Sequence, residues 1–78
     1  MRITIVGIKD TRFTNKETGE VISGQSIHFE YDDEHVEGVA VDRCFLSEKK
    51  KLNPRPHVPV EATLFYNKYG KVDEIIVR

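Results

Sequence analysis

The sequence predicts an all-β protein. Helical periodicity of apolar residues is nearly absent, whereas β-branched and aromatic residues cluster in short runs. Residues that favour turns separate these runs. The 78 residues are expected to form one domain, residues 1–78. Folding at this size removes only about 60% of the surface that the unfolded chain exposes. Any large apolar residue outside so small a core therefore needs an explanation.

The first two strands are predicted to form a hairpin. The first runs from Ile3 to Ile8 and continues irregularly through Phe13, and Gly7 within it indicates a bulge or a close backbone approach. The loop over residues 15–20 lacks apolar side chains and contains a glycine suited to positive φ. The second strand is predicted over residues 21–31.

Alternation within this second strand indicates one buried face. Ile27, Phe29 and Tyr31 alternate with polar residues, which is the period-2 pattern of a strand with one side in the core. Gly24 interrupts the strand and indicates a bend there.

A third strand is predicted from Val36 to Leu46, after an acidic turn over residues 32–34. Both of its faces are fairly apolar. The only helix-like segment follows over residues 47–51, and Asn53-Pro54 limits it to one or two turns. The proline-rich residues 55–59 are predicted to be an extended linker.

The last two strands are predicted from Val60 to Tyr66 and from Val72 to Val77. Alternation that points Leu64 and Tyr66 inward points Phe65 outward. Three strands, a short segment with at most one helical turn, and two more strands are the order of a five-stranded OB-like barrel. An SH3-like barrel or a small sandwich would give a similar pattern.

Composition argues against several classes of protein. Charged residues make up 32% and hydrophobic residues 38% of the chain, and no apolar segment approaches the roughly 20 residues that span a bilayer. We therefore expect a cytoplasmic protein with no membrane association. Cys44 is the only cysteine, which rules out an internal disulfide. The formal net charge of −1 is unusual for a nucleic-acid-binding domain. Acidic residues crowd positions 30–37, however, whereas lysines and an arginine crowd positions 49–55.

Neither a catalytic site nor a cofactor site is predicted. His28, His35 and His57 lie in a strand, an acidic turn and a proline-rich linker, without the spacing that brings two imidazoles together near a carboxylate. The acidic segment lacks the glycine and the final glutamate of a calcium-binding EF-hand loop. No phosphate-binding or dinucleotide-binding motif occurs. We expect neither an enzyme nor a requirement for a cofactor or metal.

The last hairpin combines rings with cations. Tyr69 lies at its tip between Lys68 and Lys71, and a tight turn has no room to bury a ring. Exposed rings beside lysines form a stacking surface for unpaired bases, worth about 1–3 kcal/mol per base. Phe65 is a second candidate for stacking.

Three segments together resemble the filamentous-phage gene V type single-stranded DNA-binding proteins. They are Arg12–Gly19, Gly24-Gln25, and Tyr66–Lys71 ahead of a short apolar strand. The resemblance implies a small OB-fold homodimer that coats single strands cooperatively and largely without sequence preference. It also implies that Lys16 contacts phosphate and Tyr69 stacks on a base. The chain departs from that family after Gly24, where Gln25-Ser26-Ile27 replaces further arginines and a tyrosine.

The sequence thus predicts a single-stranded DNA-binding protein that serves replication or transfer of a phage, plasmid or mobile element. The residues expected to contact the strand are Tyr69, Lys68, Lys71, Lys16, Arg12 and Phe65. Two alternatives remain open at this stage. One is a protein-protein interaction module in which the outward rings cover a partner, and the other is an RNA-binding OB domain.

Overall fold

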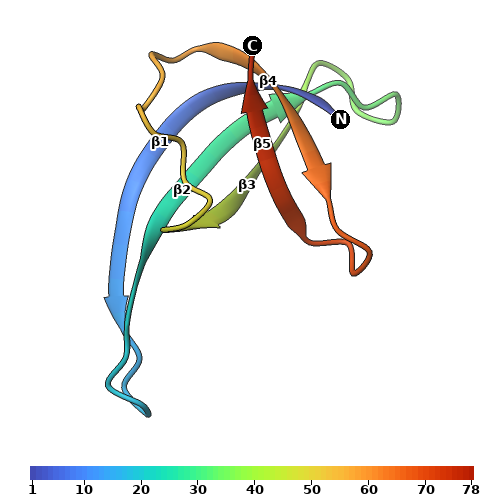
Figure 1. Cartoon of the computed structure of the whole chain (residues 1–78). Coiled ribbons are helices and arrows are strands. Elements are labelled where there is room, and N and C mark those ends of the chain that lie inside the picture. The colour runs from blue at the N-terminus through green and yellow to red at the C-terminus, as the bar shows by residue number, and fades with distance from the viewer.

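A computed structural model describes residues 1–78 and contains five β-strands and no helix (Figure 1). The strands are β1 (Arg2–Thr14), β2 (Val21–Tyr31), β3 (Ala40–Ser47), β4 (Val60–Tyr66) and β5 (Val72–Val77). The all-β prediction is confirmed. No segment of this fold is a helix that could cross a membrane.

The five strands form one antiparallel sheet in the order β3-β2-β1-β4-β5. The central strand, β1, is the longest and pairs with β2 along one edge and, through residues 2–5, with β4 along the other. The sheet curls until Cα atoms of its two edge strands, β3 and β5, lie within 8 Å of each other.

The sheet is nevertheless not closed into a barrel, because no backbone hydrogen bonds join β3 to β5. Side chains bridge the gap instead. Lys50, which follows β3, places its Nζ 2.7 Å from Oδ1 of Asp73 on β5. The barrel expected from the strand order is therefore present only as a curled, open sheet.

Two glycines shape the sheet, and the bulge expected at Gly7 is confirmed. The register between β1 and β2 shifts between Ile5 and Gly7, which leaves Val6 as the extra residue of a bulge. At Gly24, a Cβ would stand 2.1 Å from the carbonyl oxygen of Leu46 on β3, so no other residue type fits without moving the strand. The structure thus shows a close backbone approach at position 24, and the bend expected there stays a prediction.

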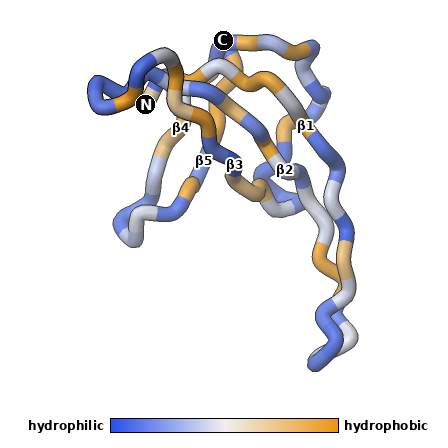
Figure 2. The backbone as a smooth tube through the Cα atoms, turned by 180° about the vertical axis from the view of Figure 1, so that it is seen from behind, coloured by the Kyte–Doolittle hydropathy of each residue, from blue (hydrophilic) through white to orange (hydrophobic).

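Eight buried side chains form the core on the concave side of the sheet. They come from all five strands: Ile3, Ile5, Ile27, Phe29, Leu46, Ala62, Leu64 and Ile75. Figure 2 shows hydrophobic residues along the strands, whereas the tip of the first hairpin is hydrophilic. Burial of this kind supplies the main favourable term in folding.

The third strand begins later than expected. The sequence predicts it from Val36, but β3 starts at Ala40. The preceding residues form a loop in which the Val36 amide donates to the carbonyl of Asp33, and Gly38 adopts a φ of 90°. These local turns outweigh the strand preference of two valines.

The segment between β3 and β4 covers the core without forming a helix. A single turn closes where the Lys50 amide donates to the Ser47 carbonyl, which agrees with the limit of at most one short helical turn. The buried Gln25 then clasps the backbone of Leu52. Its Oε1 accepts from the Leu52 amide at 2.8 Å, and its Nε2 donates to the Leu52 carbonyl at 3.1 Å.

Candidate nucleic-acid interface

The β4–β5 hairpin ends in a loop that holds an exposed ring. Asn67 organises this loop, because its Oδ1 accepts from the backbone amides of Tyr69 and Lys71 at 2.9 and 3.1 Å. Gly70 takes a φ of 76°, and its amide donates to the Asn67 carbonyl. Hydrogen bonds therefore fix the loop backbone, whereas the side chains of Tyr69 and Lys71 form no hydrogen bond or ion pair.

Tyr69 is 74% exposed, the highest fraction among the large apolar and aromatic side chains that reach solvent. Lys68 Nζ lies 5.2 Å from the centroid of the Tyr69 ring, which is a cation–π distance. The ammonium group thus covers part of the ring without burying it. A planar group that stacked on the ring would meet a positive charge beside it.

The first hairpin carries the other predicted cations. Two backbone hydrogen bonds close its loop: the Asn15 amide donates to the Glu20 carbonyl, and the Gly19 amide donates to the Asn15 carbonyl. Gly19 adopts a φ of 72°. Lys16 is exposed in this loop, and Arg12 is exposed on β1 just before it. Neither makes an ion pair.

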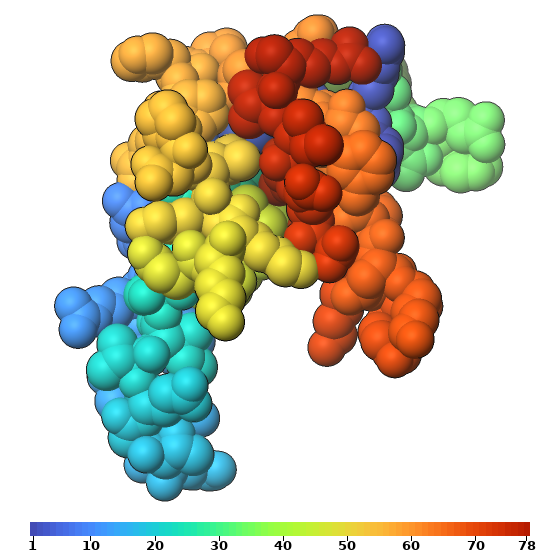
Figure 3. Space-filling view, in the orientation of Figure 1, coloured from blue at the N-terminus to red at the C-terminus, as the bar shows by residue number.

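The two hairpins project from the sheet in the same direction and are separated by a hollow (Figures 1 and 3). Arg12 lies on the concave side of the β1–β2 ladder, because it pairs with Ser23, whose hydroxyl donates to Glu48 of the covering segment. The structure thus brings predicted cations to two neighbouring projections without placing them in contact. The acidic residues 32–37 form a loop at the opposite end of the molecule.

Phe65 faces outward, as the alternation predicts, and its partner across the strand pair is Glu74, while Ile76 lies two residues further along β5 on the same face. It lies on the convex side of β4, because Leu64 beside it is buried. The prediction for Tyr66 is wrong: this ring is 52% exposed instead of facing inward. The register of the β4–β5 pair shifts between Phe65 and Tyr66, and this irregularity ends the simple alternation.

The basic stretch after β3 is engaged within the molecule. Lys50 pairs with Asp73, Lys51 with Glu48, and Arg55 with Asp10. Hydrogen bonds from Lys51 and then Ser23 lower the pKa of the Glu48 carboxyl. Lys50 and Arg55 therefore link the segment between β3 and β4 to the sheet, and Lys51 pairs within that segment, while Lys16, Lys68 and Lys71 form no ion pair.

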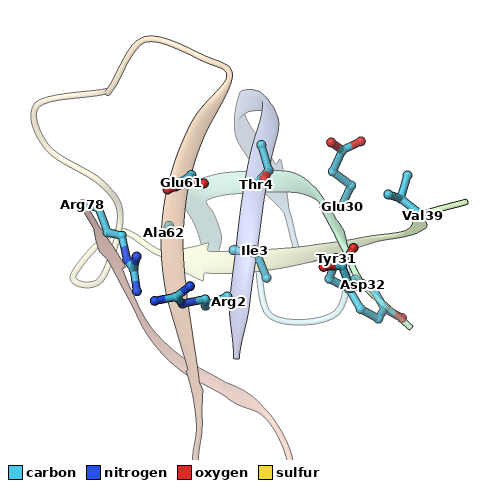
Figure 4. A pocket seen from close by; sticks show the side chains of 10 residues that line it. All are labelled: Arg2, Ile3, Thr4, Glu30, Tyr31, Asp32, Val39, Glu61, Ala62 and Arg78. Carbon is cyan, nitrogen blue, oxygen red and sulfur yellow. The ribbon is translucent and has the colours of Figure 1, made fainter. Parts of the chain in front are cut away.

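A pocket of about 230 Å³ lies at the other end of the sheet, between β1, β4 and the start of the acidic loop (Figure 4). Arg2 and Arg78 line it together with the carboxylates of Glu30, Asp32 and Glu61. Charges of both signs around one opening do not select an anion. We therefore leave this pocket out of the candidate interface.

No group with the properties of a catalytic nucleophile is found at Cys44. Burial, and then the negative charge of Asp42, raise the pKa of its thiol to about 11. The thiol is therefore almost wholly protonated at neutral pH.

Sequence reasoning did not identify the convex face of β1, β2 and β3 as a candidate surface. Lys9, Arg43 and Phe45 are exposed there, and none of the basic residues forms an ion pair. Alternation along the strands carried the signal, but the bulge at Val6 changes which residues of β1 share that face.

Comparison with known proteins yields no relative: no family model, no curated protein and no solved structure matches the chain.

Proposed function

We propose that this protein binds single-stranded DNA, largely independently of sequence, in the replication or transfer of a mobile genetic element. The observation that carries the proposal is the exposed Tyr69 ring with the Lys68 ammonium 5.2 Å from its centroid. Stacking on such a ring tolerates any base, and the adjacent cation favours the phosphate backbone.

We further propose that the open sheet is a variant of the OB fold. The pairings of β1 with β2 and β4, of β2 with β3, and of β4 with β5 are those that an OB-type Greek-key barrel requires. Only the β3–β5 edge is missing. In OB folds the loops joining strands 1 and 2 and strands 4 and 5 bind oligonucleotides, and here these loops carry Lys16 and Tyr69.

In the proposed mechanism, Tyr69 stacks on a base while Lys68 and Lys71 contact the neighbouring phosphates. Lys16 and Arg12 contact phosphates on the other side of the hollow, and Phe65 supplies a second ring. A homodimer would double these contacts, and neighbouring dimers on one strand would add cooperativity. No cofactor takes part.

Titration of a fluorescently labelled oligo-dT at two salt concentrations tests the proposal. Tyr69→Ala should weaken binding about 5- to 150-fold, the equivalent of 1–3 kcal/mol, whereas Tyr69→Phe retains the ring and should bind like the unaltered protein. Lys68→Gln should weaken binding and flatten its salt dependence, with Lys49→Gln as the matched control for charge. Absence of binding at micromolar protein, or binding indifferent to salt, would refute the proposal. A parallel titration with oligo-U compares RNA with DNA.

A second candidate is a protein-interaction module, and the exposed side chains of Phe65 and Ile76 on one face of the β4–β5 pair favour it. A protein partner on this face would lose affinity with Ile76→Asn and would be little affected by Lys68→Gln. Single-stranded DNA binding instead predicts a direct loss with Lys68→Gln, and Ile76→Asn would affect it only as far as it breaks the homodimer.

A further inference from the structure

The convex face of the β1–β2–β3 sheet carries a line of side chains that the core does not use. Ile8, Ile27 and Cys44 pair across the three strands and point inward, so the next residues, Lys9, Ser26 and Phe45, point outward in one row. The row beyond it consists of Gly7, His28 and Arg43. We call Lys9, Ser26, His28, Arg43 and Phe45 the outer track.

The Phe45 ring rests on Gly24. A Cβ built at residue 24 would stand 2.6 Å from Cζ of Phe45, so the ring occupies the space that a side chain there would take. The ring is still 41% exposed. One side of it is thus supported by the sheet, and the other is open to solvent.

The His28 ring rests on a glycine in the same way. Its Cδ2 lies 3.6 Å from the position of a Cβ at Gly7, in ordinary van der Waals contact. Around it lies a shallow recess of about 350 Å³, whose lining includes His28, Arg43 and the two exposed valines Val6 and Val41. The recess offers a ring beside apolar walls and one guanidinium group.

The cations of the outer track are not neutralised within the chain. Lys9 and Arg43 form no ion pair. Asp42 also lines the recess and keeps its negative charge, and its Oδ1 accepts a hydrogen bond from the Arg43 backbone amide at 2.7 Å instead of pairing with a cation. Between the two rings the hydroxyls of Ser26 and Thr11 lie 2.9 Å apart and add polar groups that can contact phosphate.

We propose that the outer track is a second stacking surface for unpaired bases, with Phe45 and His28 as platforms and Lys9 as a phosphate contact between them. This inference rests on the proposed function, because it extends the path of the same single strand. Gly24, beneath the Phe45 ring, and His28 are four residues apart on β2, which is about 13 Å along a strand. That is several times the roughly 3.4 Å rise between stacked nucleotides, so the two platforms suit separated bases.

Charge and shape favour a nucleic-acid strand over a protein at this surface. A ring supported on one side and bordered by cations matches a planar base and its phosphate. Protein interfaces, in contrast, are depleted of charged residues at their centre, where Lys9 lies in the outer track.

Binding of labelled oligo-dT to three variants tests the inference. Phe45→Leu keeps an apolar cover over Gly24 but removes the ring, and it should weaken binding about 5- to 150-fold. Lys9→Gln should reduce the slope of log K against log salt by about 0.7, the contribution of one phosphate contact on a single strand. Lys49→Gln, outside the track, should leave both quantities unchanged.

Crosslinking gives a direct readout. An oligonucleotide containing 5-bromodeoxyuridine should attach on irradiation to peptides containing Phe45 or His28 as well as to the peptide containing Tyr69. Circular dichroism and the thermal midpoint identify any variant that fails to fold, and crosslinking of the unaltered protein does not depend on those variants.

The outcomes separate the two proposals. If Tyr69→Ala weakens binding while Phe45→Leu and Lys9→Gln do not, and crosslinks appear only at Tyr69, the outer track is refuted and the proposed function stands. If the unaltered protein binds no oligo-dT, both are refuted. Loss of binding in Phe45→Leu, with its fold retained and crosslinks at Phe45 or His28, supports the outer track.

Discussion

At the residue scale, Gly24 links the fold to the proposed outer track. Because Gly24 has no side chain, both the Leu46 carbonyl and the Phe45 ring can lie against it. This one residue therefore allows the close approach of β3 and supports an exposed ring. Gly7 also lies under a ring, but a Cβ there would meet His28 only at 3.6 Å. The two glycines therefore differ in what they tolerate.

We predict that Gly24→Ala destabilises the protein by at least about 2 kcal/mol, because the new methyl group would overlap a backbone carbonyl that cannot turn away. Gly7→Ala is the matched control and should change the free energy of unfolding by less than about 0.5 kcal/mol. Urea denaturation followed by circular dichroism measures both. Equal stabilities for the two variants would contradict the close approach at position 24.

Cys44 provides a second prediction at this scale. With its pKa at about 11 against an ordinary 9.0, the thiol should react with Ellman's reagent ten- to a hundredfold more slowly at pH 8 than after unfolding in urea.

The raised pKa of Cys44 also means that the thiol loses its proton at a lower pH in the unfolded state than in the folded state. The contribution of Cys44 to the free energy of unfolding is therefore fully present below about pH 9 and is lost as the pH rises from about 9 to 11. Cys44→Ala should remove that pH dependence, and rapid reaction of the folded protein would contradict the burial.

At the element scale, the segment between β3 and β4 takes the place of the helix that a chain of this strand order could have carried. It is held to the sheet by the Gln25 clasp on Leu52 and by the ion pairs of Lys50 and Arg55. The exposed ion pairs contribute little individually. The side-chain amide of Gln25 is buried, so water cannot replace its hydrogen-bond partners. We therefore expect this amide to contribute more than the ion pairs to holding the segment.

We predict that Gln25→Leu costs about 2 kcal/mol, because both backbone groups of Leu52 lose their partners. For a domain of this size the thermal midpoint should fall by roughly 10 °C. Hydrogen exchange at the Leu52 amide should accelerate. Ser23→Ala removes only an exposed bond of 3.2 Å to Glu48 and should be nearly neutral. If both variants are equally stable, the clasp does not hold the segment.

The elements also show how far the sequence could predict the structure. The final hairpin has the expected bounds, because period-2 alternation and a glycine turn are both local signals. The orientation of Tyr66 was mispredicted, because a bulge has no signature in the alternation itself. Closure of the sheet depends on the distance between strands far apart in the chain, and no local pattern encodes it.

The candidate interface shows the same division. Exposure of Tyr69 could be predicted because a five-residue loop with its own glycine cannot bury a ring. The sequence could not predict that Lys50 pairs with Asp73 while Lys68 forms no ion pair. Local sequence around a lysine does not reveal a partner that is distant in the chain.

At the scale of the whole molecule, the chain is more extended than its mass requires. It exposes 6038 Å², whereas a compact 9.0-kDa monomer exposes about 4,850 Å². The projecting hairpins account for this shape (Figure 3).

Thirteen large hydrophobic residues are exposed against eight in the core, and two edge strands are unpaired. The excess of roughly 1,200 Å² exceeds the roughly 800 Å² per chain that a standard interface covers.

We therefore predict that the protein is a homodimer at micromolar concentration, and that the convex face of β4 and β5 contributes to the interface. Ile76, 49% exposed on edge strand β5, is the test position. Sedimentation should give twice the chain mass of 9.0 kDa for the unaltered protein and a shift towards 9.0 kDa for Ile76→Asn. Val58→Asn makes the same exchange at an exposed valine outside the sheet and should leave the dimer intact. Because Phe65 shares the outward face of the β4–β5 pair with Ile76, Phe65→Ala should change the sedimenting mass if the interface covers this ring, and only the affinity for DNA if it does not. A single species of 9.0 kDa in the unaltered protein would contradict the dimer. The extended surface would then be left for the bound DNA strand to cover.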